Sequence, residues 1–496
     1  MSRYDAIVIG SGLGGLVSAY ILARNGMKVL VLEKQPVPGG CLQTFARRGV
    51  RFETGMHYIG SMGEGQILRR FFDYLGLTPE VRLQRLDEEA FDRISFGGEV
   101  YPFAMGHERF ARRLGEYFPR DRDDIEAYVR MIRNIADSSP MYSFSGMDTG
   151  RLLEPEYISA SVNGAIASVV RNERLQNVLV GNIPLHAAVK DTTPIYIHAL
   201  ISDFYIKGAY RMVGGSDAVA RSLAESIVRF GGEVRCSAGV ARVLCDESRA
   251  TGVETEDGER FEARYVISDI HPSLLLAMTD SHLIRKAYRE RIGSLQQTVS
   301  NFTVYMKFRD GAVPYMNSNF YHYDSDTVWG CEEYGDDWPR SFLYMHQCSE
   351  EGQRFAREGL LIAYMRYDEV ARWQGTKPGR RGAEYEEFKR RRAERLLEAL
   401  ERQMPGTLSG VEEWWSSTPL TYEDYTGTRE GSMYGIVRNC NFPSLTNVSQ
   451  RTRIPNLFLA GQNINSHGVL GVIIGAILAC SEIIGRQTIT GQIGGE

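Results

Sequence analysis

Residues 4–15 read Tyr-Asp-Ala-Ile-Val-Ile-Gly-Ser-Gly-Leu-Gly-Gly, and this stretch decides the fold. Its apolar start predicts a short buried strand that runs into Gly10, Gly12 and Gly15, the spacing G-x-G-x-x-G. Gly10 allows a tight turn, Gly12 lets the backbone approach a diphosphate, and Gly15 lets the next helix pack closely on the strand. Apolar side chains at helical spacing follow, so the free N–H groups of that helix would face the diphosphate. The stretch therefore predicts a dinucleotide-binding unit.

A second strand is predicted over residues 29–32, and it delivers Glu33 where an acidic residue holds the ribose hydroxyls of a dinucleotide. An acidic side chain at this place would repel a 2′-phosphate, so we expect FAD or NAD rather than NADP. The alternative interpretation is a surface glutamate that happens to follow a strand.

Two further stretches point to a flavoprotein. Gly39 and Gly40 follow Glu33 closely, and residues 456–463, Asn-Leu-Phe-Leu-Ala-Gly-Gln-Asn, precede a glycine-rich apolar helix near the C-terminus. Together with the first stretch, they resemble the flavoprotein superfamily of amine oxidases, phytoene desaturases and glutathione-reductase-type FAD domains. Four short motifs most resemble the phytoene desaturase, carotenoid isomerase and all-trans-retinol 13,14-reductase branch: residues 55–60, 418–421, 431–435 and 467–471.

The resemblance implies FAD as the cofactor and assigns residues to it. On the positions that match the superfamily motifs, the FAD contacts are Gly10, Gly12, Leu13, Gly14, Gly15, Glu33, Lys34, Gly40, Gly55, Met56, Val240, Gly461, Gln462, Leu470, Gly471 and Val472. Val240 is expected to bring its backbone to the adenine, and the N-terminus of the last helix is expected to face the pyrimidine side of the flavin. Amine oxidases commonly carry an acid where Gln462 stands, so the neutral amide departs from their pattern.

Five side chains are candidates for the substrate side of the flavin. From motif position, Tyr58, His57 and Tyr434 are the candidate catalytic residues that move a proton. Tyr425 and Met433 are candidates for the wall of a flat, apolar substrate pocket. The alternative is structural: Tyr58 would belong to the core, and His57 would be hydrogen-bonded to backbone.

The expected fold class is α/β, with a Rossmann-like FAD-binding domain of the glutathione-reductase type and a discontinuous α+β substrate domain. The FAD-binding domain is expected to take residues 1–95, 208–285 and 445–496, and the substrate domain residues 96–207 and 286–444. Residues 64–205 are mostly helical by pattern. Period-two runs at 298–308, 341–346 and 360–366 predict antiparallel strands with one covered face.

Composition excludes some classes of protein. With 496 residues, 43% of them hydrophobic, the chain can bury large cores, and a formal charge of −5 suggests no nucleic-acid partner. Its seven cysteines are scattered without metal-binding spacing, which favours reduced thiols in a cytoplasmic protein and no metal. No secretory signal or uninterrupted apolar run of about 18 residues is found. We expect a soluble protein, or one that lies on a membrane through a basic helix over 384–403, unless that face is simply solvated.

The chemistry is expected to come from the flavin, because no nucleophile or metal arrangement emerges. By resemblance, the protein saturates, desaturates or isomerises double bonds of a hydrophobic isoprenoid or polyene, like a carotenoid or retinoid, through hydride transfer at flavin N5. Gly214-Gly215 does not form a second dinucleotide fingerprint, so electrons are expected from an external partner: reduced nicotinamide, quinone or oxygen. The alternatives are an amine-oxidase-like enzyme and a non-catalytic flavin- or lipid-binding protein.

Overall fold

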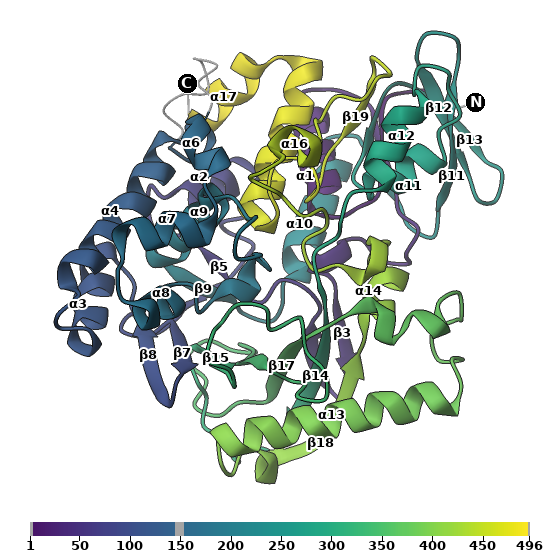
Figure 1. The fold of residues 1–496 in the computed structure, drawn as a ribbon. Coiled ribbons are helices and arrows are strands. Elements are labelled where there is room, and N and C mark those ends of the chain that lie inside the picture. The colour runs from purple at the N-terminus through teal and green to yellow at the C-terminus, as the bar shows by residue number, and fades with distance from the viewer. Residues whose placement is uncertain (1–2, 144–152, 495–496) are drawn as a thin grey trace.

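The glycine-rich stretch follows β1 (Arg3–Ile9), which lies inside a seven-stranded sheet (Figure 1). The computed structural model describes residues 3–143 and 153–494, so residues 144–152 of the expected helical block and the outermost ends of the expected domains lie outside it. The other strands are β2 (Val29–Leu32), β10 (Glu233–Arg235), β11 (Val240–Cys245), β12 (Ala250–Thr255), β13 (Arg260–Ser268) and β19 (Leu457–Leu459). Strands β10, β2, β1, β13 and β19 are parallel, and β11 and β12 extend the sheet antiparallel to β13. The carboxyl ends of the parallel strands therefore meet at one edge, where open α/β sheets bind ligands.

Successive residues of β1 face two different layers. Ala6 and Val8 pack with α1 (Leu13–Arg24), α10 (Asp217–Arg229) and α16 (Gly468–Ile484). Ile7 and Ile9 pack with the antiparallel strands, α11 (Pro272–Ala277) and α12 (Lys286–Gly293). All four side chains are at most 3% exposed. A strand covered on both faces reads as a continuous apolar run, which is how it appears in the sequence.

The three predicted strands of the substrate region belong to a second sheet, which has seven strands in the order β18-β14-β17-β16-β15-β7-β8. These are β18 (Val411–Ser417), β14 (Ser300–Phe308), β17 (Glu358–Met365), β16 (Ser341–His346), β15 (Asn319–Tyr323), β7 (Asp92–Phe96) and β8 (Glu99–Phe103). Neighbours are antiparallel except β15 and β7, which are parallel.

The expectation of a single covered face for this sheet is wrong, because every residue of β16 and β17 is buried. Phe302 and Val304 pack with α13 (Ala383–Gln403), the long helix beneath the sheet in Figure 1. Tyr305 points the other way, into the core shared with the helical block. Helices on both sides thus exclude water from this sheet, as in the first.

Of the described residues between 64 and 205, most are helical, as predicted. The helices are α2 (Ile67–Tyr74), α3 (His107–Tyr117), α4 (Arg122–Ser138), α5 (Pro140–Ser143), α6 (Pro155–Ser159), α7 (Val162–Val169), α8 (Glu173–Leu179) and α9 (Ile195–Ile206). A small sheet of β5 (Ile59–Gly60), β9 (Ala209–Met212) and β6 (Leu83–Arg85) joins this block to the rest. The expected domain boundary at residue 95 falls inside β7, whose partner β15 belongs to the second sheet.

The remaining elements lie around the two sheets: the hairpin of β3 (Thr44–Arg47) and β4 (Val50–Glu53), and the helices α14 (Pro419–Thr426), α15 (Pro443–Thr446) and α17 (Arg486–Gly494). Near the C-terminus, α16 packs directly on α1, and Cys480 Sγ lies 3.5 Å from the carbonyl oxygen of Ser18. Of the helices in residues 3–143 and 153–494, none has the length and apolar composition needed to cross a bilayer.

Candidate flavin site and the cavities beside it

The turn between β1 and α1 is tied to Glu33 through Ser11. Ser11 donates both its backbone N–H and its hydroxyl to Glu33 Oε2, at 2.9 and 2.6 Å. The other carboxylate oxygen accepts from Gln35 N at 2.7 Å. Glu33 is only 8% exposed, so it is no ordinary surface glutamate. These bonds place its carboxylate at the mouth of the glycine turn, where a ribose is held in this kind of fold.

The glycines of the turn stand where the neighbouring atoms leave no room for a side chain. A Cβ at Gly15 would stand 2.2 Å from the backbone oxygen of Gly10. Cβ atoms at Gly12, Gly14 and Gly461 would each stand within 2.5 Å of an Asp269 carboxylate oxygen. The turn after β1 and the turn after β19 therefore converge on one carboxyl group, and the cradle between them suits a ligand that approaches the backbone closely.

Sequence reasoning did not single out Asp269. It follows β13 directly, and its N–H donates to Ile9 O at 2.9 Å, which places it between the ends of β1 and β19. The pKa of its carboxyl is raised to about 7, chiefly by burial; the hydrogen bond from Gly15 N–H lowers it, and the nearby charge of Glu33 acts in the same direction as burial. The signal that could have found it is an acid at the carboxyl end of a predicted central strand.

The flavin cavity lies beyond this turn, between the two sheets. Of the predicted residues, Leu13, Gly55, Met56, His57, Tyr58, Met433, Tyr434, Gln462 and Val472 line it. The first turn of α16 forms part of its wall through Gly468 and Val469, so the positive end of a 17-residue helix faces the cavity. This arrangement can hold a flavin ring beside the N-terminus of the helix.

Other predicted cofactor residues lie around the cavity rather than on its surface. Leu470 is buried in the core beside α16, and a Cβ at Gly471 would stand 2.7 Å from Ser466, so both serve helix packing. Gly40 lies against Gly12. Val240 is 9% exposed and packs under the sheet. Lys34 is exposed and pairs with Glu256 at 3.4 Å.

Tyr58 belongs to a buried network beside the cavity. Its hydroxyl lies 2.7 Å from that of Tyr321 and 3.2 Å from Asp92 Oδ2. Asp92 is fully buried and also accepts from Asn319 Nδ2 at 2.7 Å. Burial raises the pKa of Asp92 to about 7, against the effect of its hydrogen bonds from Asn319, Asn182 and Tyr58. The network can therefore hold or release a proton near neutral pH.

His57 and Tyr434 differ from Tyr58 in what their polar atoms do. Burial and the charge of Arg211 lower the pKa of His57 to about 4, and its Nδ1 has no partner among the described residues. The Tyr434 hydroxyl donates to Pro184 O at 2.8 Å, and its ring lies 4.6 Å from that of His467. His57 is therefore neutral at pH 7 and cannot donate as an imidazolium. The Tyr434 hydroxyl is held by a backbone carbonyl, which cannot return a proton as Asp92 can to Tyr58.

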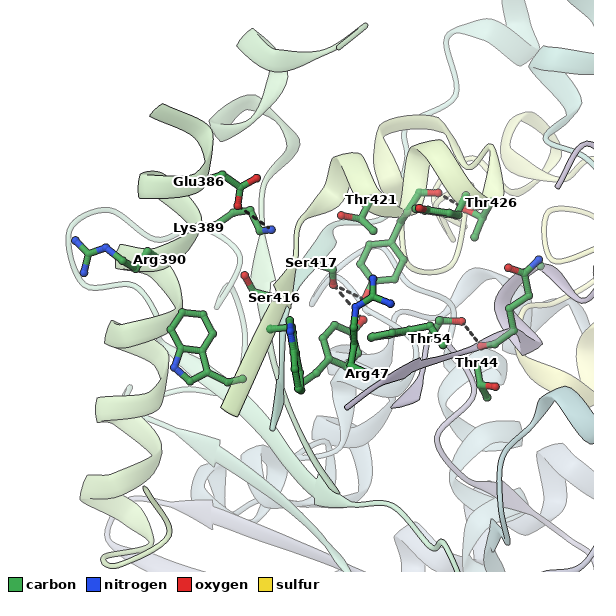
Figure 2. Close-up of a pocket in the computed structure, with 18 residues that line it drawn as sticks. Thr44, Arg47, Thr54, Glu386, Lys389, Arg390, Ser416, Ser417, Thr421 and Thr426 are labelled. Atoms are coloured by element: carbon green, nitrogen blue, oxygen red, sulfur yellow. Dashed lines mark hydrogen bonds and ion pairs between the residues drawn. The ribbon is translucent and has the colours of Figure 1, made fainter. Parts of the chain in front are cut away.

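A second cavity of about 590 Å³, the outer pocket, adjoins the flavin cavity through Thr54, Tyr422 and Thr426. Figure 2 shows α13 bringing Glu386, Lys389 and Arg390 to one side of it and α14 bringing Thr421 and Thr426 to another. Its aromatic lining is Phe45, Tyr305, Trp414, Trp415, Tyr422 and Tyr425. Tyr425 is half exposed and lines this pocket, whereas Met433 lines the inner one.

The cradle at the glycine turn, the position of Glu33 and the helix end at the inner cavity define the class: this is an FAD-binding flavoprotein. The chain belongs to the family of flavin containing amine oxidoreductases, whose family model matches residues 13–484. FAD is its cofactor, as the resemblance predicted.

Known relatives cover almost the whole chain. All-trans-retinol 13,14-reductase from Homo sapiens is 28% identical, over 98% of this chain and 86% of its own length. Prolycopene isomerase from Arabidopsis thaliana is 25% identical, over 97% and 83%. The branch suggested by the motifs is thereby confirmed.

Solved structures show the same fold. An oxidoreductase from Methanosarcina mazei superposes with a TM-score of 0.65 at 18% identity, covering 95% of this chain and 99% of that one. Cyclohexylamine oxidase from Brevibacterium oxydans superposes with a TM-score of 0.60 at 16% identity, covering 99% of both.

Proposed function

We propose that this protein is an FAD-dependent oxidoreductase that saturates, desaturates or isomerises double bonds of a hydrophobic isoprenoid or polyene. One observation carries the proposal: the described residues that line the flavin cavity include no Asp, Glu, Lys or Arg. An amine substrate would arrive as a cation and would favour a carboxylate or a comparable partner. A neutral, apolar lining favours a neutral alkene, which is the kind of substrate that the names of the curated relatives imply.

The proposed domain boundaries follow the two sheets. We propose a glutathione-reductase-type FAD-binding domain built from the N-terminal segment, residues 208–285 and residues 445–496. The substrate domain takes residues 96–207 and 286–444, together with β7, because β7 pairs with β15 of the substrate sheet. In this division the flavin cavity lies at the junction, so both domains supply its walls.

For the reaction, FAD supplies hydride transfer at N5. The chain holds the alkene in a dry cavity and handles the proton. Of the three candidates, we favour Tyr58, which donates a proton to the alkene carbon next to the one that receives hydride. Asp92 then returns a proton to Tyr58 across their hydrogen bond. Desaturation uses the same groups in reverse, and isomerisation needs no net proton transfer.

The outer pocket offers room for the rest of a long substrate. It opens beside the inner cavity and is lined by aromatic side chains, which suit an extended polyene. The electron partner is external in this proposal: reduced nicotinamide, quinone or oxygen. We place the protein in the cytoplasm, and the alternative is peripheral contact with a membrane.

The test is anaerobic reduction of the purified holoenzyme followed by mixing with polyenes. Reoxidation of the flavin with loss of a substrate double bond identifies a reductase, and isomer change without reoxidation identifies an isomerase. If no polyene or retinoid produces either change, the proposal is contradicted and the protein is a binding protein. Tyr58→Phe should lower turnover roughly 100-fold with flavin content unchanged, whereas Tyr434→Phe, the matched control, should change it far less.

A further inference from the structure

A third cavity, of about 440 Å³, lies on the other side of His57 from the flavin. It is separate from the flavin cavity except for His57, which lines both. We call it the arginine pocket after its five arginines, Arg51, Arg82, Arg211, Arg221 and Arg357. They come from β4, β9, α10 and the loops before β6 and β17, so the tertiary fold alone brings them together.

Only two of these arginines have a carboxylate partner within the described ranges. Arg51 pairs with Asp217 at 3.0 Å, and Arg221 pairs with the same carboxylate. No ion pair is formed by Arg82, Arg211 or Arg357 with any residue that the structure describes. One carboxylate thus serves two arginines. The other three have no carboxylate at ion-pair distance among the described residues, although the charges of Arg211 and Arg357 still act on Asp92 and Glu358 from farther away.

The missing carboxylate matters most for Arg211, because its side chain is only 2% exposed and water cannot solvate its charge. Its Nη2 donates to Ser318 O at 2.8 Å and to Asn319 Oδ1 at 2.9 Å, while its Nε finds no acceptor among the described residues. Asp92 lies behind Asn319, but burial raises its pKa to about 7, so it is a weak counterion at neutral pH. A buried guanidinium without a full set of partners is destabilising, and an anion that supplies the missing acceptors would remove this cost.

The acids that line the pocket, Glu53, Glu80 and Glu358, are fewer than its five arginines. Burial raises the pKa of Glu53 to about 8, so its carboxyl is mostly protonated at pH 7, where it binds Ser216. Burial raises the pKa of Glu358, while the hydrogen bond from Ser349 Oγ at 2.6 Å and the charge of Arg357 act against burial. Glu80 lines the pocket as well and is exposed. The pocket is therefore positive, and the first turn of the 13-residue helix α10 adds backbone N–H groups to its wall through Ala218.

We propose that the arginine pocket binds a phosphate group, either free or carried by a nicotinamide dinucleotide. Guanidinium groups bind phosphate oxygens with two parallel hydrogen bonds, and a dianion would satisfy the unpaired arginines together. The inference does not depend on the alkene substrate. A dinucleotide held here would lie next to His57 and thus beside the flavin, where an electron donor is required.

The experiment is calorimetric titration of the FAD-loaded protein with inorganic phosphate in a phosphate-free buffer. We expect one saturable site, and we expect Arg82→Ala and Arg357→Ala each to weaken it at least tenfold. Arg242→Ala is the matched control: Arg242 is exposed on β11, forms no ion pair with a described residue, and its loss should change nothing. The flavin content of each variant checks that it has folded.

Two further measurements sharpen the result. Phosphate should raise the melting temperature of the wild type and of Arg242→Ala, but not of the double variant Arg82→Ala/Arg357→Ala. If NADPH displaces the bound phosphate, the natural ligand is a dinucleotide. If phosphate binds and NADPH does not displace it, the natural ligand is a free oxyanion. No phosphate binding at millimolar concentration, or equal affinity in the pocket variants and the control, overturns the proposal.

Discussion

At the scale of single residues, the tolerance of each glycine in the turn depends on which atom a Cβ at that position would meet. The obstacle to a side chain at Gly15 is the backbone oxygen of Gly10, which cannot move without breaking the turn. At Gly12 the obstacle is Asp269 Oδ2, the end of a side chain that can rotate. Glycines of one motif therefore differ in their tolerance, although they look equivalent in the sequence.

The first prediction follows from this difference. Gly15→Ala should abolish FAD retention, because its Cβ would lie 2.2 Å from a backbone atom. Gly12→Ala should keep part of the flavin, and Asp269→Ala in the same chain should restore more of it by removing the obstructing carboxylate. The ratio of absorbance at 450 to 280 nm of the purified variants measures this. Equal loss in both single variants would contradict the explanation.

Glu53 gives a prediction on pH. Its folded pKa, raised by burial to about 8 from 4.5, means that the folded state keeps a proton that the unfolded chain releases above pH 4.5. The associated stability is present below pH 4.5 and is lost as the pH rises to about 8. Relative to Glu53→Gln, the wild type should lose on the order of 3 kcal/mol of unfolding free energy over this range. Urea unfolding of both proteins at pH 5 and pH 8 measures this difference. If the free energies of unfolding of the two proteins change equally between the two pH values, the prediction is refuted.

At the scale of elements, α13 and α14 are joined by two hydroxyl groups. Tyr385 of α13, 4% exposed, has its hydroxyl 2.8 Å from Oγ1 of Thr418, which is fully buried at the start of α14. The contact fixes the helix that lines the outer pocket with Tyr422 and Tyr425. The basic residues of α13 are also held by acids, as Arg390 is by Glu387 at 2.7 Å, which favours a solvated face over a membrane contact.

The third prediction tests this link. Thr418→Val should lower the free energy of unfolding by about 1–3 kcal/mol, because the buried Tyr385 hydroxyl loses its partner. Tyr385→Phe added to Thr418→Val should cost less than the two single changes together, since no hydroxyl is then left unpaired. A double-mutant cycle in urea measures the coupling, and strictly additive values would show that the contact contributes nothing.

At the scale of the whole molecule, the folded protein excludes protons from most of its histidines. Seven of the nine have a lowered pKa, chiefly through burial: His57, His186, His198, His271, His322, His346 and His467. Buried carboxyl groups act in the opposite direction, among them Asp92 and Asp269, with a pKa raised to about 7, and Glu53, with a pKa raised to about 8.

The fourth prediction is a stability maximum near neutral pH. Below pH 6.5 the unfolded chain binds protons at these histidines that the folded protein does not, so their stabilising contribution is lost as the pH falls toward about 4. Each net proton taken up on unfolding contributes about 1.4 kcal/mol per pH unit. The seven histidines outweigh these acids between pH 5 and 6. The melting temperature of the holoprotein should therefore fall steeply from pH 7 to pH 5, and a flat profile would be the contrary result.

The sequence by itself determined the parts whose physics is local. The spacing of Gly10, Gly12 and Gly15, the acid at Glu33 and the period-two runs specify turns and strands through steric limits on neighbouring residues. They were enough to predict the FAD fold, the helical block and three strands of the substrate sheet, β14, β16 and β17. They could not show that β7 joins this sheet, because strand pairing depends on contacts far apart in the chain.

Only the tertiary structure decided what surrounds the cofactor. Asp269 reaches the cradle because β13 lies between β1 and β19. Tyr58 gains Asp92 as a partner through packing between two sheets, and five arginines from distant segments share one pocket. Burial and charge at a site are sums over neighbours that folding brings together, so no single stretch of the sequence contains them.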